Sequence, residues 1–181
     1  MRLLFAADLA ARASGWVALD IGEQPYRVVA HGIVAIKGEW GPLAWEEKQR
    51  AWADVLWECV EGKDLPEYHF ACIAYESPGR SDIGDGHSTK RMMAQAEALF
   101  GAVAAGYTRR IMALDQADVK LAITRQRRAD KTQVSFYLEL RRQDGEWAAP
   151  PDEDGTWSEH EVDALAVGLA AAALLKQEDM A

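Results

Sequence analysis

Two short apolar runs open the chain, with a break of small residues between them. Residues 3–7 and 16–19 each have the length of a buried strand, and Ala, Arg, Ser and Gly lie in the segment that separates them. This pattern predicts a hairpin. Residues 27–37 then alternate between apolar and polar side chains, which predicts a third strand. The chain is therefore expected to begin with an antiparallel meander of three strands.

Helical and extended patterns alternate along the rest of the chain. Apolar residues recur at helical spacing over residues 45–60, where the tryptophans are interpreted as core, and residues 68–75 read as a buried strand that ends at Glu76. Residues 143–161 contain no Lys or Arg and seven acidic residues, which predicts an exposed connection. The other elements predicted are a helix over residues 88–106, a strand over residues 109–114, two helices that begin at Gln116 and Lys131 with Asp115 and Asp130 as caps, and a last helix over residues 158–175.

Two aspartates lie in apolar surroundings. Asp8 ends the first predicted strand, and Asp163 is one turn into a helix whose residues 162–175 are otherwise almost wholly apolar. An unpaired carboxylate buried there costs several kcal/mol, so each aspartate is expected to have a buried partner or a metal ion. Ser158 followed by Glu161 matches a capping box, which predicts where this helix starts.

Composition places the chain in a broad class. Its 181 residues are expected to form one domain, and Cys59 and Cys72 fall in helix and strand patterns typical of buried, reduced thiols. No segment has the features of a signal peptide, and no apolar run approaches the ~20 residues of a membrane span. We therefore expect a cytoplasmic protein of a bacterial or phage-infected cell, with no membrane partner.

The charge is distributed unevenly. The formal net charge is −9, yet residues 109–142 contain nine basic and four acidic residues. A basic region on an acidic body suits a nuclease that grips phosphates on one face. A solvated helix surface is the other interpretation of the same charges.

Asp8, Glu76 and Asp163 each lie at the boundary of a predicted element. Carboxylates are the ligands that Mg2+ takes while it keeps waters and substrate phosphate oxygens, so this set suits phosphodiester hydrolysis. Spacing alone leaves open that the three acids are unrelated caps and surface charges.

Four stretches of the chain match motifs of a known nuclease family. They are a strand-borne aspartate with a Ser-Gly-Trp return (residues 8–16), Ala-Tyr-Glu (74–76), Val-Lys with Ala-Asp-Lys-Thr-Gln-Val (119–120 and 129–134), and His-Glu-Val-Asp-Ala-Leu-Ala (160–166). The sequence thereby resembles the RuvC-type Holliday junction resolvases of the ribonuclease H-like superfamily, as a divergent or phage-like member. The resemblance implies an α/β fold with a central mixed sheet of five strands, in which parallel strands join the antiparallel meander and helices cover both faces.

The resemblance also implies an active site and a reaction. The catalytic and metal-binding residues it implies are Asp8, Glu76, His160 and Asp163, with two Mg2+ or Mn2+ ions per site. The reaction would be metal-dependent cleavage of branched DNA, resolving a four-way junction by paired nicks. Two nicks imply two active sites and hence a homodimer, for which residues 88–106 are the candidate interface.

DNA contacts are expected from basic residues around this site. Lys120 and Lys131 match lysines that contact DNA or support cleavage in the family. Further DNA-binding residues are expected at Arg80, Arg125, Arg127 and Arg128. The glycine-rich residues 78–86 are predicted to form a loop that closes over a substrate.

The chain departs from the family pattern at three places. Leu9-Ala10-Ala11 stands where a glycine usually follows the first aspartate, residues 125–128 (Arg-Gln-Arg-Arg) replace a glycine-rich turn, and no aromatic residue follows Glu76 directly. These differences concern how a junction is distorted more than how it is cut. A flap or general branched-DNA nuclease of the same fold, and a nucleic-acid-binding protein of this fold that does not cut, remain as alternatives.

Overall fold

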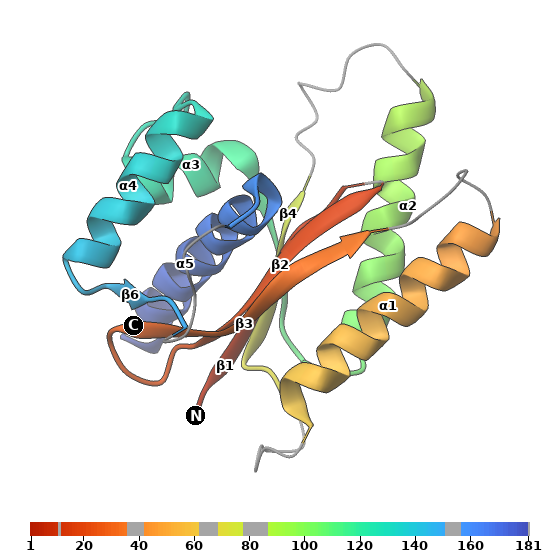
Figure 1. Ribbon diagram of the computed structural model, residues 1–181, viewed down its shortest axis with the longest axis horizontal. Coiled ribbons are helices and arrows are strands. Elements are labelled where there is room, and N and C mark those ends of the chain that lie inside the picture. Colours follow the sequence, from red (N-terminus) through yellow and green to blue (C-terminus); the bar gives the residue numbers. More distant parts are fainter. Residues whose placement is uncertain (11, 36–41, 62–68, 78–86, 151–156, 181) are drawn as a thin grey trace.

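A single mixed sheet with helices on both faces forms the body of the protein (Figure 1). The computed structural model describes residues 1–10, 12–35, 42–61, 69–77, 87–150 and 157–180. The strand order across the sheet is β5-β4-β1-β2-β3-β6. The strands are β1 (Leu3–Asp8), β2 (Ala13–Asp20), β3 (Tyr26–Ala35), β4 (Cys72–Ser77), β5 (Ile111–Asp115) and β6 (Trp147–Ala148).

The strand pairings confirm the predicted meander and correct the strand count. β1 pairs with β2 and β2 with β3 in antiparallel fashion, while β4 and β5 extend the other edge in parallel. The sheet has six strands rather than the predicted five, because β6 pairs in parallel with β3. A two-residue strand has no alternation that a sequence pattern could reveal. Trp147 is buried, so the prediction of an exposed connection over residues 143–161 is wrong at this point.

Two helical layers sandwich the sheet. α1 (Pro42–Val60) and α2 (His87–Ala104) cover one face, and α5 (Glu159–Asp179) lies along the other face with α3 (Gln116–Thr124) and α4 (Lys131–Gln143) outside it (Figure 1). All of these helices were predicted to within a few residues. Of the helices described, none is long and apolar enough to cross a membrane.

Alternation along β1 decides which face carries the chemistry. Leu4 and Ala6 belong to the hydrophobic core under α5, whereas Leu3, Phe5 and Ala7 belong to the core under α1 and α2. Asp8 continues the first series because successive side chains of a strand point to opposite faces. Its carboxylate therefore lies on the α5 side of the sheet.

α5 packs directly on the central strands. Residues from Ala164 to Ala172 are all buried, as the apolar pattern predicted. A Cβ added at Gly168 would lie 2.8 Å from Cδ1 of Leu19, which is closer than side chains approach one another. Small residues along α5 thus bring the helix close to the sheet, and its first turn is fixed against the strand ends.

Local signals at the helix starts are confirmed. Asp115 caps α3, and capping boxes begin α4 at Asp130 and α5 at Ser158. The other end of the sheet is fixed by the termini, where Arg2 pairs with Asp179 at 2.6 Å. Cys59 and Cys72 are both buried free thiols, as expected.

Candidate active site

Asp8 and Glu76 lie side by side at the ends of two central strands. They are partners in the parallel register of β1 and β4, so their side chains share the α5 face. On the other side of Asp8, its partner in β2 is Gly15. This row of paired residues places two carboxylates next to each other at the edge of the core.

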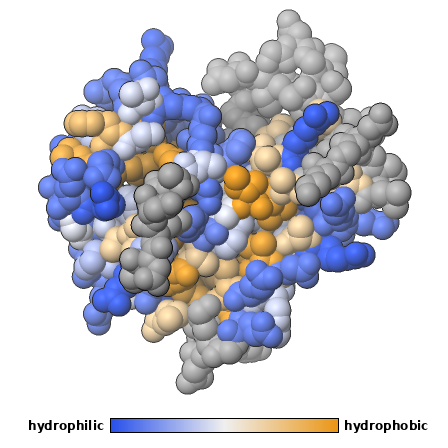
Figure 2. Space-filling model, in the orientation of Figure 1, coloured by the Kyte–Doolittle hydropathy of each residue, from blue (hydrophilic) through white to orange (hydrophobic). Residues whose placement is uncertain are grey.

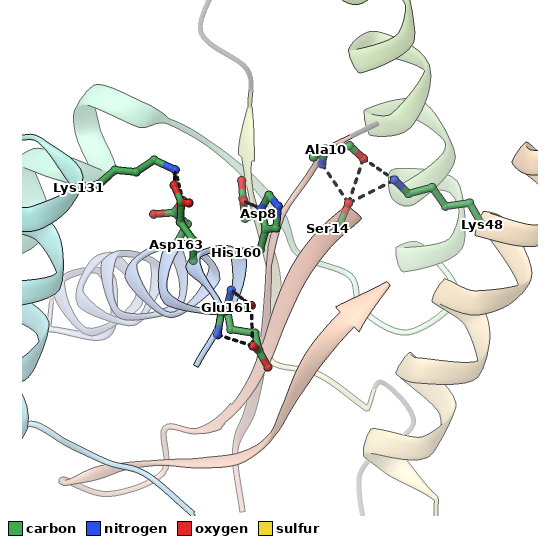
Figure 3. Close-up of polar contacts among 10 residues, drawn as sticks. Asp8, Ala10, Ser14, Lys48, Lys131, His160, Glu161 and Asp163 are labelled. Carbon is green, nitrogen blue, oxygen red and sulfur yellow. Dashed lines mark hydrogen bonds and ion pairs between the residues drawn. The ribbon is translucent and has the colours of Figure 1, made fainter. Parts of the chain in front are cut away.

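The first turn of α5 enters this row above Gly15. A Cβ at position 15 would lie 2.0 Å from the carbonyl oxygen of His160, so the helix start occupies the space that a side chain would need. Nδ1 of His160 lies 3.0 Å from Oδ2 of Asp8 (Figure 3). An ionised carboxylate can only accept, so Nδ1 of His160 donates to an ionised Asp8, and Nε2 is the ring nitrogen that this contact leaves available.

Asp163, on the next turn of α5, faces α4. Its side chain is 24% exposed, and its Oδ2 accepts from the ammonium group of Lys131 at 3.3 Å (Figure 3). Lys131 also pairs with Glu159, one residue before His160. The sequence predicted a buried partner or a metal ion for Asp163, and the partner in the structure, Lys131, has a side chain that is 61% exposed.

The pKa values of Glu76 and Asp8 are both raised. Burial is the main cause for Glu76, whose pKa rises to about 7, and the charges of Asp8 and Asp163 add to it. Burial also raises the pKa of Asp8, against which the hydrogen bond from His160 acts. The site therefore holds more negative charge than its own residues balance.

Residues on α3 moderate this charge. A hydrogen bond between Gln116 and Glu76 lowers the pKa of Glu76, and so does the nearby positive charge of Lys120. The sequence analysis assigned no role to Gln116. Its position at the first residue of α3, directly after β5, is the signal that could have identified it.

The donor set suits a hard divalent cation. Asp8, Glu76 and Asp163 supply carboxylate oxygens and His160 supplies one imidazole nitrogen, which are ligands that Mg2+ and Mn2+ accept. Within the part of the chain that the structure describes, no three such side chains are already close enough together to hold an ion. The charge of Asp163 nonetheless raises the pKa of both Asp8 and Glu76, so the three charges interact across one site, and a divalent cation would relieve that repulsion.

Many basic residues of the 109–142 region have structural roles. Arg141 donates to the carbonyls of Ala122 and Ile123 at the end of α3 and pairs with Glu146. Other pairs of the region are Arg142 with Glu139, Arg110 with Glu178 and Arg127 with Asp118. The side chains of the predicted DNA-binding residues Lys120, Arg125 and Arg128 make no hydrogen bond or ion pair to the described residues. On the side formed by α3 and α4, hydrophilic residues surround a few hydrophobic ones (Figure 2).

Arg125 has an unusual backbone conformation. It is the C-cap of α3 with φ 61° and ψ 17°, the left-handed region that glycine favours. An L-residue there costs roughly 1–2 kcal/mol relative to glycine. The chain thus carries an exposed arginine at a position where glycine would be less strained.

A further set of hydrogen bonds, centred on Glu161, holds the start of α5 against β3. Glu161 is buried and accepts hydrogen bonds from the backbone and hydroxyl of Ser158, and its other oxygen lies 2.6 Å from Nδ1 of His31 on β3. The His31 ring stacks on Trp157 with centroids 4.4 Å apart. The capping box was predicted, but the contact with β3 was not, because it joins residues 130 positions apart.

The structure brings together most of the predicted site. Asp8, Glu76, His160 and Asp163 converge at one end of the sheet, with Lys120 and Lys131 near them. Arg80 and the predicted closing loop over residues 78–86 lie outside the described residues. Residues that the sequence analysis missed at or behind the site are Gln116, Glu159, His31 and Lys48.

Comparison with solved structures identifies the fold. No protein-family model and no curated protein sequence matches the chain. The structure of Thermus thermophilus RuvC superposes with a TM-score of 0.71 at 16% identity, covering 97% of this chain and 96% of that one. This chain has the RuvC fold. The yeast mitochondrial Holliday junction resolvase Ydc2 gives a TM-score of 0.66 at 11% identity, covering 96% of this chain and 80% of that one.

The RuvC fold confirms the expected fold class. The nuclease domain of the human cytomegalovirus terminase, soaked with manganese, also has it, with a TM-score of 0.58 at 9% identity and coverage of 94% of this chain and 83% of that domain. The expected ribonuclease H-like α/β architecture, with a mixed sheet and helices on both faces, is therefore correct apart from the sixth strand.

Proposed function

We propose that this protein is a divalent-metal-dependent endonuclease that cuts branched DNA, with a four-way junction as its main substrate. The observation that carries the proposal is the pair of half-buried carboxylates of Asp8 and Glu76, which lie near Asp163 and near the basic side chains of Lys120 and Lys131. Support for the substrate comes from Thermus thermophilus RuvC in complex with a Holliday junction, which has the same fold at 17% identity.

Metal ions fit this donor set. Asp8, Glu76, Asp163 and His160 would hold two Mg2+ or Mn2+ ions. When bound, such ions lower the pKa of water for attack on phosphorus and stabilise the leaving oxygen.

The protein's own residues would act on both the attacking water and the substrate phosphates. Asp8 orients the His160 ring, so that Nε2 can accept a proton from water or serve as a ligand. Lys131 reaches the site from α4 and Lys120 from α3, where each can neutralise a substrate phosphate. Arg125 and Arg128 extend this positive flank without internal partners among the described residues, and Arg127 and Arg80 are further proposed contacts.

Symmetric resolution requires two such sites. A homodimer would supply them, and α2 remains the proposed interface because it forms the outer layer on the face away from α5 (Figure 1). Each protomer would then cut one strand of the junction.

A cleavage assay tests the proposal. Wild-type protein with Mg2+ should nick a synthetic four-way junction, and Asp8→Asn should reduce the rate roughly 1,000-fold, equivalent to about 4 kcal/mol of transition-state stabilisation. Asp144→Asn is the matched control, because Asp144 is an exposed cap at the far end of α4 and the change removes the same charge. No metal-dependent cutting of any branched substrate by folded wild-type protein would refute the enzyme.

Mapping the cut positions separates two nuclease functions. Paired nicks at symmetric positions would identify a resolvase, and cuts on one arm only would identify a flap or general branched-DNA nuclease. The second function is retained because the terminase nuclease domain has the same fold, so the fold alone does not specify the substrate.

A further inference from the structure

Lys48 of α1 is a lysine buried in the core. Its side chain is 1% exposed, and its ammonium group donates to the carbonyl of Ala10 and to Oγ of Ser14 at 3.2 Å. Lysine is almost never fully buried unless it is paired, because the ammonium loses its hydration. Burial accordingly lowers the pKa of Lys48 to about 8. An apolar residue would be the simpler choice on this face of α1, so the ammonium has a task that packing does not explain.

The partners of Lys48 close a ring across the hairpin between β1 and β2. Oγ of Ser14 accepts from the backbone NH of Ala10 at 3.0 Å and donates to its carbonyl at 3.1 Å (Figure 3). Lys48 binds both residues from α1. The two sides of the hairpin are therefore connected to each other and to a helix at the same point.

This ring lies directly next to Asp8. Ala10 is two residues after Asp8, just beyond the end of β1, and Ser14 precedes Gly15, the partner of Asp8 in β2. Asp8 itself is the last residue of β1. It is thus held from both strands of the hairpin, on the face of the sheet opposite to its carboxylate.

A restraint is needed at this position because the site repels itself. Asp8 and Glu76 are register partners in β1 and β4, so two carboxylates lie side by side at the strand ends, where like charges repel when both are ionised. A strand end has fewer ladder hydrogen bonds than a strand centre to resist such a force. A fixed hairpin keeps Asp8 in place while a cation binds.

We propose that Lys48 is a positioning residue of the metal site, which fixes the β1–β2 hairpin and thereby the backbone of Asp8. The proposal rests on the proposed function only in that the acidic cluster binds a divalent cation. Lys48 acts from the α1 face through Ala10 and Ser14, and the carboxylates face α5. Metal affinity should therefore depend on a residue that belongs to the opposite layer.

Direct metal binding distinguishes positioning from general stabilisation. Binding of Mn2+ would be followed by the electron paramagnetic resonance signal of the free ion, at a temperature where circular dichroism shows each variant folded. Lys48→Met keeps the length of the side chain and removes the ammonium, and Ser14→Ala removes the hydroxyl at the centre of the ring. Leu56→Ala is the control, because Leu56 is fully buried two turns further along α1 and its loss destabilises the same layer.

The expected result is at least fivefold weaker Mn2+ binding in Lys48→Met and a smaller loss in Ser14→Ala, with Leu56→Ala within twofold of wild type. In cleavage assays, Lys48→Met should raise the metal concentration for half-maximal rate by a similar factor and leave the rate at saturating metal within about threefold of the wild-type rate.

Wild-type Mn2+ affinity in Lys48→Met, or an equal loss of affinity in Leu56→Ala, would overturn the proposal. If Lys48→Met does not fold, wild-type affinity in Ser14→Ala overturns it alone. A wild-type protein that binds Mn2+ but cuts no branched DNA refutes the proposed function and leaves this inference to its own test.

Discussion

The carboxylates of Asp8 and Glu76 project from neighbouring strand ends, whereas Asp163 and His160 project from the first turns of a helix. The strand pair is half-buried, and the pKa of both carboxylates is raised. The helix pair is more exposed, and Lys131 balances Asp163. The two halves of the site thus differ in how their charge is compensated. The strand half has an excess of negative charge that a cation would neutralise. In the helix half, Asp163 is already paired with Lys131, and a DNA phosphate could replace Asp163 as the partner of this lysine.

The largest test of this contrast is Glu76→Gln. Loss of a carboxylate from the metal site should lower the cleavage rate roughly 1,000-fold. The same change should raise the free energy of unfolding at pH 8 without divalent ions by about 3 kcal/mol, because ionised Glu76 has a pKa near 7 in the folded protein and 4.5 when exposed. Chemical denaturation measures the second effect. Glu178→Gln, an exposed change at the opposite end of the sheet, should not increase stability, and an unchanged or lower stability of Glu76→Gln would contradict the repulsion between the strand carboxylates.

The pH and metal dependence of stability follow from the same group. The folded protein binds the proton of Glu76 more tightly than the unfolded chain, so the stability that protonated Glu76 contributes is fully present below pH 4.5 and is lost as the pH rises to about 7. The advantage of Glu76→Gln over wild type should therefore be close to zero at pH 4.5 and grow up to pH 8. Mg2+ at about 100 times its Kd should stabilise the wild type at pH 8 by about 3 kcal/mol. A constant advantage across this pH range would show that the gain has another cause.

Local signals in the sequence predicted one half of this site better than the other. The capping box at Ser158 and the apolar run after Asp163 fixed the start of α5, because both depend on residues within two turns. The placement of Glu76 next to Asp8 depends on strand register, which the resemblance to a family supplied and spacing alone did not. The sequence analysis assigned no role to Lys48. Its burial depends on Ala10 and Ser14, which are remote in sequence, and β6 was missed for the same reason, since its partner strand begins at Tyr26.

The proposed role of the basic side chains near the helix half in DNA binding can be tested at Arg125. Arg125→Gly relieves a left-handed backbone conformation and should raise the free energy of unfolding by about 1 kcal/mol. The same change should weaken DNA binding and reduce the slope of log Kd against log salt by about one, since one phosphate contact is lost. Denaturation and salt-dependent binding titrations measure the two effects. Arg128→Ala is the matched control and should weaken binding without stabilising the fold. A stability gain in both variants would show that the gain does not come from the backbone conformation of Arg125.

The smallest expected effect concerns Lys131, which pairs with acidic residues of the protein and is also proposed to bind a DNA phosphate. Lys131 binds Glu159 and Asp163 from α4, so a DNA phosphate has to compete with Glu159 for its ammonium group. Exposed ion pairs are worth about 0.2–1 kcal/mol, so Glu159→Gln should tighten binding of a four-way junction about threefold in EDTA. Glu139→Gln removes the same charge near the far end of α4, where it pairs with Arg142, and should change Kd less than 1.5-fold. In a Lys131→Met background the gain from Glu159→Gln should disappear. An equal gain in the two glutamate variants would mean that net charge alone is responsible and that Lys131 is not held back from DNA by its internal partners.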